Sequence, residues 1–133
     1  MRVRAMAAAL TVLTMGGAAM AQDDPLARYV WAARVLVVSV LDAGDARLAA
    51  QRQALASARA GLSERDLVTV EAVGGDAEAV AIRKKLGLPA NAFRAVLVGK
   101  DGGAKLTSPE PIPPQRLFST IDAMPMRRDE MRR

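Results

Sequence analysis

The chain has 133 residues, of which 51% are hydrophobic, and its 19 basic and 14 acidic side chains give a formal net charge of +5. This length suits one domain with one hydrophobic core, and the absence of cysteine and histidine excludes thiol, disulfide and zinc chemistry and histidine-based catalysis. Four of the positive charges fall in the last seven residues and aromatic side chains are few, so we expect no nucleic-acid partner.

The first 21 residues are predicted to be a signal peptide. Two arginines precede an apolar run over Ala5–Met15, and Ala19–Ala21 matches the small-x-small pattern of signal peptidase, with cleavage before Gln22. The run is too short to span a membrane; an uncleaved amphipathic helix or anchor is the alternative. We expect residues 22–133, with 17 basic and 14 acidic side chains and a net charge of +3, to form an exported protein, periplasmic or secreted, with no transmembrane segment.

The first predicted strand covers residues 34–41. Its sequence, RVLVVSVL, is a nearly continuous apolar run, which is typical of a strand covered on both faces in the middle of an α/β sheet. A helical turn opened by Pro25 precedes it. A helix over 46–62 follows, with leucines repeating every seven residues on one face.

Further strands and helices alternate in the second half of the chain. They are a strand over 66–73, a helix over 77–86, strands over 93–99 and 104–107, and a last helix from Pro114 that turns Met124 inward. Asp76 and Gly87 are predicted to cap the helix over 77–86, and Arg83 is expected on its solvent face. The turn Lys100–Gly103 makes the last two strands antiparallel.

This order of elements predicts an α/β protein with a thioredoxin-like three-layer fold, a mixed sheet of about four strands with helices on both faces. Two right-handed β-α-β crossovers and a terminal hairpin would build the sheet. The prediction is a single domain over 22–133 with a basic C-terminal tail.

Two carboxylates occupy the position of the reactive thiol of thioredoxin-like enzymes. That thiol lies where the first core strand meets the next helix, which here corresponds to Ser39–Arg47 and contains Asp42 and Asp45. Helix capping and solvated turn carboxylates explain these acids better than a calcium or magnesium site. Because no histidine can activate a serine, we assign no catalytic residue, no metal ligand and no cofactor.

Three polar residues are candidates for ligand binding near the sheet. Gln51 lies on the apolar face of its helix, so its amide either bonds to the backbone or faces a ligand in a crevice at the carboxyl edge of the sheet. Arg65 and Asp66 belong to an acid-Arg-acid triplet before the second strand. That triplet is interpreted as an ion pair at the start of the strand, which Arg34 could join.

The hairpin turn and the C-terminal tail supply the other candidates. The turn lacks the spacing of a phosphate-binding loop. The tail places methionines beside arginines, either as an adaptable contact surface or with Met124 and Met126 closing the core and the arginines in solvent. The candidate residues of these two segments are Lys100, Asp101, Met126, Arg127 and Arg128.

Several stretches together resemble the peroxiredoxin-like domain-of-unknown-function family. They are Tyr29–Trp31 followed by Arg34–Leu36, Gln51, Glu64–Val68, Leu97–Leu106 and Ile121–Arg128. Members of this family are short exported bacterial proteins, and the domain also occurs in secreted sushi-repeat and extracellular matrix proteins. The resemblance implies a thioredoxin-like fold and a binding role, with no established activity or cofactor.

The leading functional hypothesis is an exported, non-redox binding or adaptor module for an unknown protein or small-molecule ligand. It would use a crevice near Asp42, Gln51, Arg65 and Lys100, or the Met/Arg tail. One alternative is an enzyme that uses carboxylate, lysine or arginine groups at that crevice. The other is a structural protein of the cell envelope.

Overall fold

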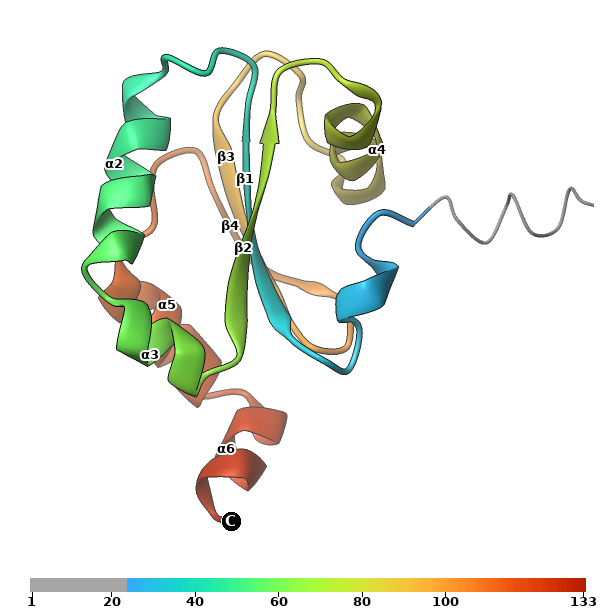
Figure 1. Cartoon of the computed structure of the whole chain (residues 1–133). Coiled ribbons are helices and arrows are strands. Elements are labelled where there is room, and N and C mark those ends of the chain that lie inside the picture. Colours follow the sequence, from blue (N-terminus) through green and yellow to red (C-terminus); the bar gives the residue numbers. More distant parts are fainter. Residues whose placement is uncertain (1–23) are drawn as a thin grey trace, which may run out of the picture.

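A computed structural model describes residues 24–133 of the chain; the predicted signal peptide lies outside these residues. The described part is a four-stranded mixed sheet with helices on both faces (Figure 1). In chain order its elements are the short 3-10 helix η1 (Ala27–Tyr29), β1 (Arg34–Val40), α2 (Ala46–Ala56), α3 (Arg59–Glu64), β2 (Leu67–Val73), α4 (Ala77–Leu86), β3 (Arg94–Val98), β4 (Ala104–Ser108), α5 (Pro114–Asp122) and α6 (Pro125–Met131). None of the described helices is long and apolar enough to cross a membrane.

The strand order is β2-β1-β3-β4, so β1 lies inside the sheet as its apolar run predicted. Alternate side chains of a strand point to opposite faces, and all seven residues of β1 are buried. Leu36 and Val38 join the core beneath α2 and α5, and Val35 and Val37 join the core beneath α4. The predicted three-layer α/β architecture is confirmed (Figure 1).

The expectation of two parallel crossovers is wrong for the second one. β1 and β2 are parallel, but β3 is antiparallel to β1. Ser39 of β1 pairs with Ala72 near the end of β2 and with Arg94 at the start of β3, so α4 and its following loop return the chain to the same end of the sheet. The direction of β3 depends on pairing between distant segments, which the apolar pattern does not contain.

Three local expectations also need correction. The helix predicted over 46–62 breaks at Ser57, whose hydroxyl bonds to the carbonyl of Ala54 (2.8 Å) and competes with the helical backbone. The last helix ends at Asp122, and Pro125 begins the separate helix α6, because proline cannot continue a helix. Arg83 is buried rather than solvent-exposed.

Arg83 joins the ends of two neighbouring strands. Its guanidinium donates to the hydroxyl of Ser39 (2.8 Å) and to the carbonyls of Val40 (3.0 Å) and Ala72 (2.9 Å). These carbonyls lie where β1 and β2 end, so an arginine from α4 satisfies buried backbone groups there. The predicted caps of α4 are confirmed, since Asp76 accepts from the Ala79 amide and Gly87 adopts a left-handed φ of 68°.

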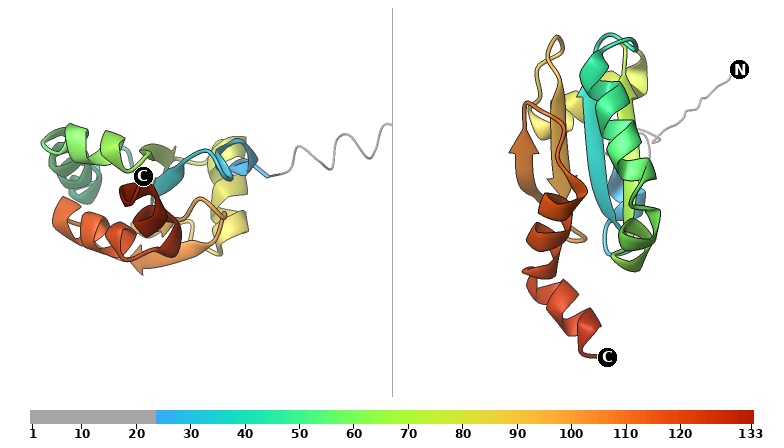
Figure 2. Two further views of the ribbon diagram at one scale, coloured as in Figure 1. Left: turned by 90° about the horizontal axis from the view of Figure 1, so that it is seen from below. Right: turned by 90° about the vertical axis from the view of Figure 1, so that its left-hand side faces the viewer.

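Helix α6 lies past the end of the sheet. Figure 2 shows it continuing beyond α5 to the C-terminus. It therefore lies at the end where β1 begins and β3 finishes, the opposite end from Asp42 and Asp45.

Candidate functional site

The acidic corner between β1 and α2 is a capped turn. Asp45 accepts from the backbone amide of Arg47 (2.8 Å) and pairs with the guanidinium of the same residue (3.0 Å). Asp42 accepts from the amide of Gly44 (2.8 Å). The hydrogen bond from Arg47 lowers the pKa of Asp45 and keeps its carboxyl ionised. Asp45 is therefore the N-cap of α2, and Asp42 is a turn carboxylate.

No described residues form a cluster for an oxygen-bound metal ion. Within 24–133, no group of three or more aspartate, glutamate, histidine or cysteine side chains converges in a way that could hold one. Among these residues, Asp42 and Asp45 of the capped turn are therefore not part of a larger acidic cluster that could bind a metal ion.

Gln51 is bound on both sides by the backbone. Its Nε2 donates to the carbonyl of Ile112 (3.0 Å), and its Oε1 accepts from the amide of the same residue (2.8 Å). The side chain is fully buried. This pair of bonds ties α2 to the proline-rich connector before α5, so both polar atoms of the buried amide are engaged by the backbone, as the structural interpretation predicted.

Charged side chains gather at the other end of the sheet, around the start of β1. Arg34 is buried, donates to the carbonyl of Arg65 (2.8 Å) and pairs with Glu130 of α6 (3.2 Å). Lys100, from the hairpin turn, bonds to the same Glu130 (2.8 Å) and to Asp66 (2.9 Å). The predicted ion pair within the Glu64–Asp66 triplet is not formed, because each of its side chains pairs with a residue outside it. Arg34 contacts the triplet through the carbonyl of Arg65.

A second group of charges lies between α3, α5 and α6. Arg65 makes a two-point contact with Asp122 (2.9 and 3.0 Å) and stacks over the ring of Phe118 at 4.1 Å. Arg127 is buried and pairs with Asp122 (3.1 Å) and Glu64 (2.9 Å). These two groups together are called the α6 ion-pair network. Its members are Arg34, Glu64, Arg65, Asp66, Lys100, Asp122, Arg127 and Glu130.

The network keeps Asp122 and Glu130 ionised. The hydrogen bond from Arg65 lowers the pKa of Asp122, and a bond from Arg127 adds to the effect. Burial alone would raise the pKa of Glu130, but hydrogen bonds from Lys100 and Arg34 outweigh it and hold that pKa below its usual value. Both carboxylates are therefore charged at neutral pH and act as permanent anchors for α6.

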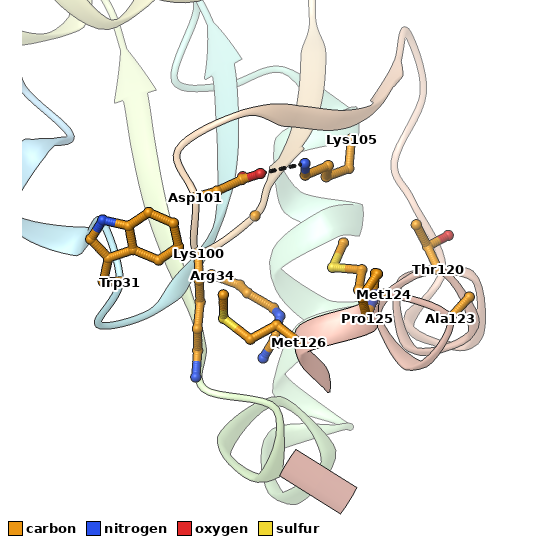
Figure 3. Close-up of a pocket in the computed structure, with 11 residues that line it drawn as sticks. Trp31, Arg34, Lys100, Asp101, Lys105, Thr120, Ala123, Met124, Pro125 and Met126 are labelled. Atoms are coloured by element: carbon orange, nitrogen blue, oxygen red, sulfur yellow. Dashed lines mark hydrogen bonds and ion pairs between the residues drawn. The ribbon is translucent and has the colours of Figure 1, made fainter. Parts of the chain in front are cut away.

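A cleft of about 490 Å³ opens beside this network (Figure 3). We call it the Trp31 cleft; it is lined by Trp31, Arg34, Gly99, Lys100, Asp101, Lys105, Thr120, Ala123, Met124, Pro125 and Met126. The start of β1, the β3–β4 hairpin and the α5–α6 junction each supply part of its wall. Its volume falls in the range of small-molecule sites, roughly 300–1,000 Å³.

Trp31 is the most exposed large side chain of the cleft. Its side chain is 66% exposed, and its backbone has a φ of 68°, a conformation that costs a non-glycine residue about 1–2 kcal/mol. The amide of Trp31 donates to the carbonyl of Lys100 (2.6 Å), which holds the two segments together. A large exposed aromatic ring in a strained backbone is a feature that recurs at binding sites.

Arg34 provides a buried donor without a partner. Its side chain is 1% exposed, and its Nε has no hydrogen-bond partner among the described residues. Most buried polar groups are hydrogen bonded. A buried N–H that lacks an acceptor, on a residue that lines a cleft, marks a place where a ligand atom can complete the hydrogen bonding.

The predicted site residues fall into four groups. Lys100, Asp101 and Met126 line the Trp31 cleft; Arg65, Asp66 and Arg127 belong to the network beside it; Arg128 is exposed; and Asp42, Asp45 and Gln51 lie elsewhere. The expectation of one crevice that joins Asp42, Gln51, Arg65 and Lys100 is wrong, because antiparallel β3 delivers the hairpin to the end of the sheet where β1 begins.

Trp31, Arg34 and Lys105 are polar or aromatic residues of the cleft that are not among the predicted site residues. The sequence pattern places Lys105 in a strand, relates Arg34 to an ion pair and gives Trp31 no site role. One signal was available, since Trp31 is the single tryptophan of the chain and follows directly on the first helical turn.

The cleft contains no arrangement for nucleophilic catalysis. The hydroxyl of Thr120 already donates to the carbonyl of Arg116 (2.8 Å). The bond from Lys105 lowers the pKa of Asp101, so this carboxyl is a poor proton donor near neutral pH. The lining residues can bind and orient a ligand through donors and apolar contacts.

Comparison with known proteins gives a family and a fold. The family described as "Domain of unknown function (DUF4174)" matches residues 25–130. Among solved structures, the reduced 2-Cys peroxiredoxin of Plasmodium vivax is similar with a TM-score of 0.52 over 80% of this chain and 84% of that protein, at 13% sequence identity. No curated protein matches the chain. The structural likeness supports the thioredoxin-like fold and, at this identity, nothing about activity.

Proposed function

Because the chain belongs to the DUF4174 family and has a thioredoxin-like fold without cysteine, we propose that it is an exported, non-redox module that binds a small-molecule ligand in the Trp31 cleft. The single observation that carries the proposal is that Arg34, a residue of the cleft wall, has a buried Nε without a partner among the described residues. The strained, exposed Trp31 on the same cleft supports it.

Export is part of this proposal and rests on residues 1–21. Their composition suits a signal peptide, and the resemblance to domains of secreted sushi-repeat proteins agrees with an extracytoplasmic location. Expression of the full chain in a bacterium with a periplasm tests this part. We expect a periplasmic protein whose mass corresponds to a chain beginning at Gln22, and an uncleaved cytoplasmic product would contradict export.

Binding in the cleft is tested by a fragment screen with two-dimensional NMR of the mature protein. The indole N–H of Trp31 gives one resonance, because the chain has one tryptophan. We expect fragments that shift this resonance together with those of Lys100 and Met126. The proposal fails if no fragment of the screen perturbs the residues that line the cleft.

Three variants locate the binding. Trp31→Gly removes the ring and suits the left-handed backbone, so the protein stays folded and affinity falls about tenfold, or about 1.4 kcal/mol. Met126→Ala weakens binding several-fold, whereas Met131→Ala, an exposed methionine of the same helix that does not line the cleft, leaves it unchanged. Equal effects of the two methionine variants would place the ligand elsewhere.

A further inference from the structure

We infer that the ligand of the Trp31 cleft is a small organic carboxylate with a flat apolar body, its carboxylate accepting from the Nε of Arg34 and its body lying against Trp31. This inference rests on the proposed function and names the ligand class.

The donors of the cleft point to an acceptor ligand. The Nε–H of Arg34 has no partner among residues 24–133. An ammonium group has three N–H donors, and the structure gives two bonds for Lys100, to Asp66 and Glu130. Lys105 makes one such bond, to Asp101. Donors therefore remain on all three cationic side chains that line the cleft.

The charges around the cleft favour an anion of low charge. Three cationic side chains and one acid line it, and the acids that partner Arg34 and Lys100 are Asp66 and Glu130, which do not line it. A ligand in the cleft thus meets more cations than acids. Because Asp66, Asp101 and Glu130 pair with these three cations, the surroundings carry no net positive charge, so a singly charged carboxylate fits better than a phosphate dianion.

The apolar wall of the cleft suits a flat body. Trp31 contributes an exposed ring, and Met124 and Met126 contribute unbranched thioether side chains on the opposite wall (Figure 3). Aromatic rings stack in offset or edge-to-face arrangements, and methionine adapts its rotamer to flat partners. Figure 3 shows the flexible side chain of Met126 beside that of Arg34, so in this proposal a rotamer change of Met126 opens the way to the buried Nε.

Four matched naphthyl compounds test the ligand class. They are 2-naphthoate, the neutral 2-naphthamide, the cation 2-naphthylmethylammonium and 2-naphthyl phosphate. We expect 2-naphthoate to bind about tenfold more tightly than 2-naphthamide, because it gains a charge-assisted hydrogen bond, and to shift the Nε–H resonance of Arg34. Equal or tighter binding of the amide, the cation or the phosphate overturns the inference.

Two variants test the role of the cations. Lys105→Gln leaves the carboxylate of Asp101 without its cation in the cleft, so we expect the preference for naphthoate over naphthamide to shrink at least twofold. The control is Lys84→Gln, which changes an exposed lysine of α4 and should leave the preference unchanged. Arg34→Lys keeps the charge but lacks the Nε–H, and in a folded variant the preference should disappear. An unchanged preference in Lys105→Gln overturns the inference even where Arg34→Lys does not fold.

The outcome separates the inference from the proposed function. If fragments bind in the cleft but carboxylates hold no advantage, the ligand class is wrong and the binding function stands. If neither the naphthyl set nor the fragment screen perturbs the cleft, both are wrong.

Discussion

Gln51 illustrates how one residue can satisfy a long-range structural need. Its position between leucines of α2 predicted a buried amide, and the nitrogen and the oxygen of a buried amide each need a hydrogen-bond partner. The structure supplies both from the backbone of one residue, Ile112, which is 61 positions away. The side-chain amide of Gln51 thus bonds to the backbone of the connector before α5 in the way that a neighbouring strand would.

We predict that Gln51→Met destabilises the protein by roughly 2–4 kcal/mol, because two buried peptide groups of Ile112 lose their partners. Urea unfolding followed by circular dichroism measures the change in the free energy of unfolding. The matched control is Gln53→Met on the exposed face of the same helix, which we expect to change stability by less than about 0.5 kcal/mol. Equal costs at the two positions would show that the two bonds contribute nothing.

At the scale of elements, helix α6 is held mainly by charge. Arg127 is its buried residue, and it reaches Asp122 at the end of α5 and Glu64 at the end of α3. Glu130 connects the same helix to Arg34 and Lys100. The helix closes one wall of the Trp31 cleft through Pro125 and Met126, so the network that holds α6 also shapes the cleft.

We predict that Arg127→Gln loosens α6 and destabilises the protein by roughly 1–3 kcal/mol, because hydrogen bonds to charged groups are lost inside the network. Amide hydrogen exchange in α6 should become faster than in the parent protein, and by a larger factor than in β1. Arg128→Gln is the control, since Arg128 is the exposed neighbour in the same helix, and exchange should stay as in the parent. Uniform faster exchange throughout the sheet would argue against a local role.

At the scale of the whole molecule, the mixed sheet separates two ends with different character. The end that a thioredoxin-like enzyme would use for its thiol holds a capped turn and the buried Arg83. The other end holds the network and the cleft. The separation follows from the antiparallel direction of β3, which places Lys100 beside the start of β1.

We predict that stability falls in acid and at strongly basic pH. A hydrogen bond from Arg65 lowers the pKa of Asp122, and a hydrogen bond from Lys105 lowers the pKa of Asp101. The folded protein therefore binds fewer protons at these carboxyls than the unfolded chain does. Their stabilisation is complete above the ordinary aspartate pKa, about 3.9, and is lost as the pH falls through the lower folded pKa. Lys100 behaves in the opposite sense: burial alone would lower its pKa, but bonds to Glu130 and Asp66 raise it overall. Its contribution is lost as the pH rises through that folded pKa.

Urea unfolding between about pH 2 and 11 measures this profile, across the ordinary pKa values of aspartate and lysine. Asp122→Asn should show a smaller loss of stability in acid than the parent, and salt should reduce the contribution of the exposed pairs. An Asp122→Asn variant with the same acid profile as the parent would contradict the assignment.

The sequence by itself determined most of the elements and the chemistry that is absent. The predicted strands agree with the structure to within one residue at each end, because alternation and apolar runs reflect burial within a few neighbouring residues. The caps of α4 and the hairpin turn were also predictable, because they depend on residues within a few positions of each other. The lack of cysteine and histidine ruled out thiol chemistry before any fold was known.

Only the tertiary structure decided where the candidate site lies. The direction of β3, the separate helix α6, the buried Arg83 and the unpartnered Nε of Arg34 all depend on contacts between segments far apart in the chain. Arg34 and Glu130, for example, are 96 positions apart, and neither pattern nor spacing connects them. Local periodicity specifies which face of an element is buried, whereas the convergence of Trp31, Arg34, Lys100 and Met126 results from how those faces pack together.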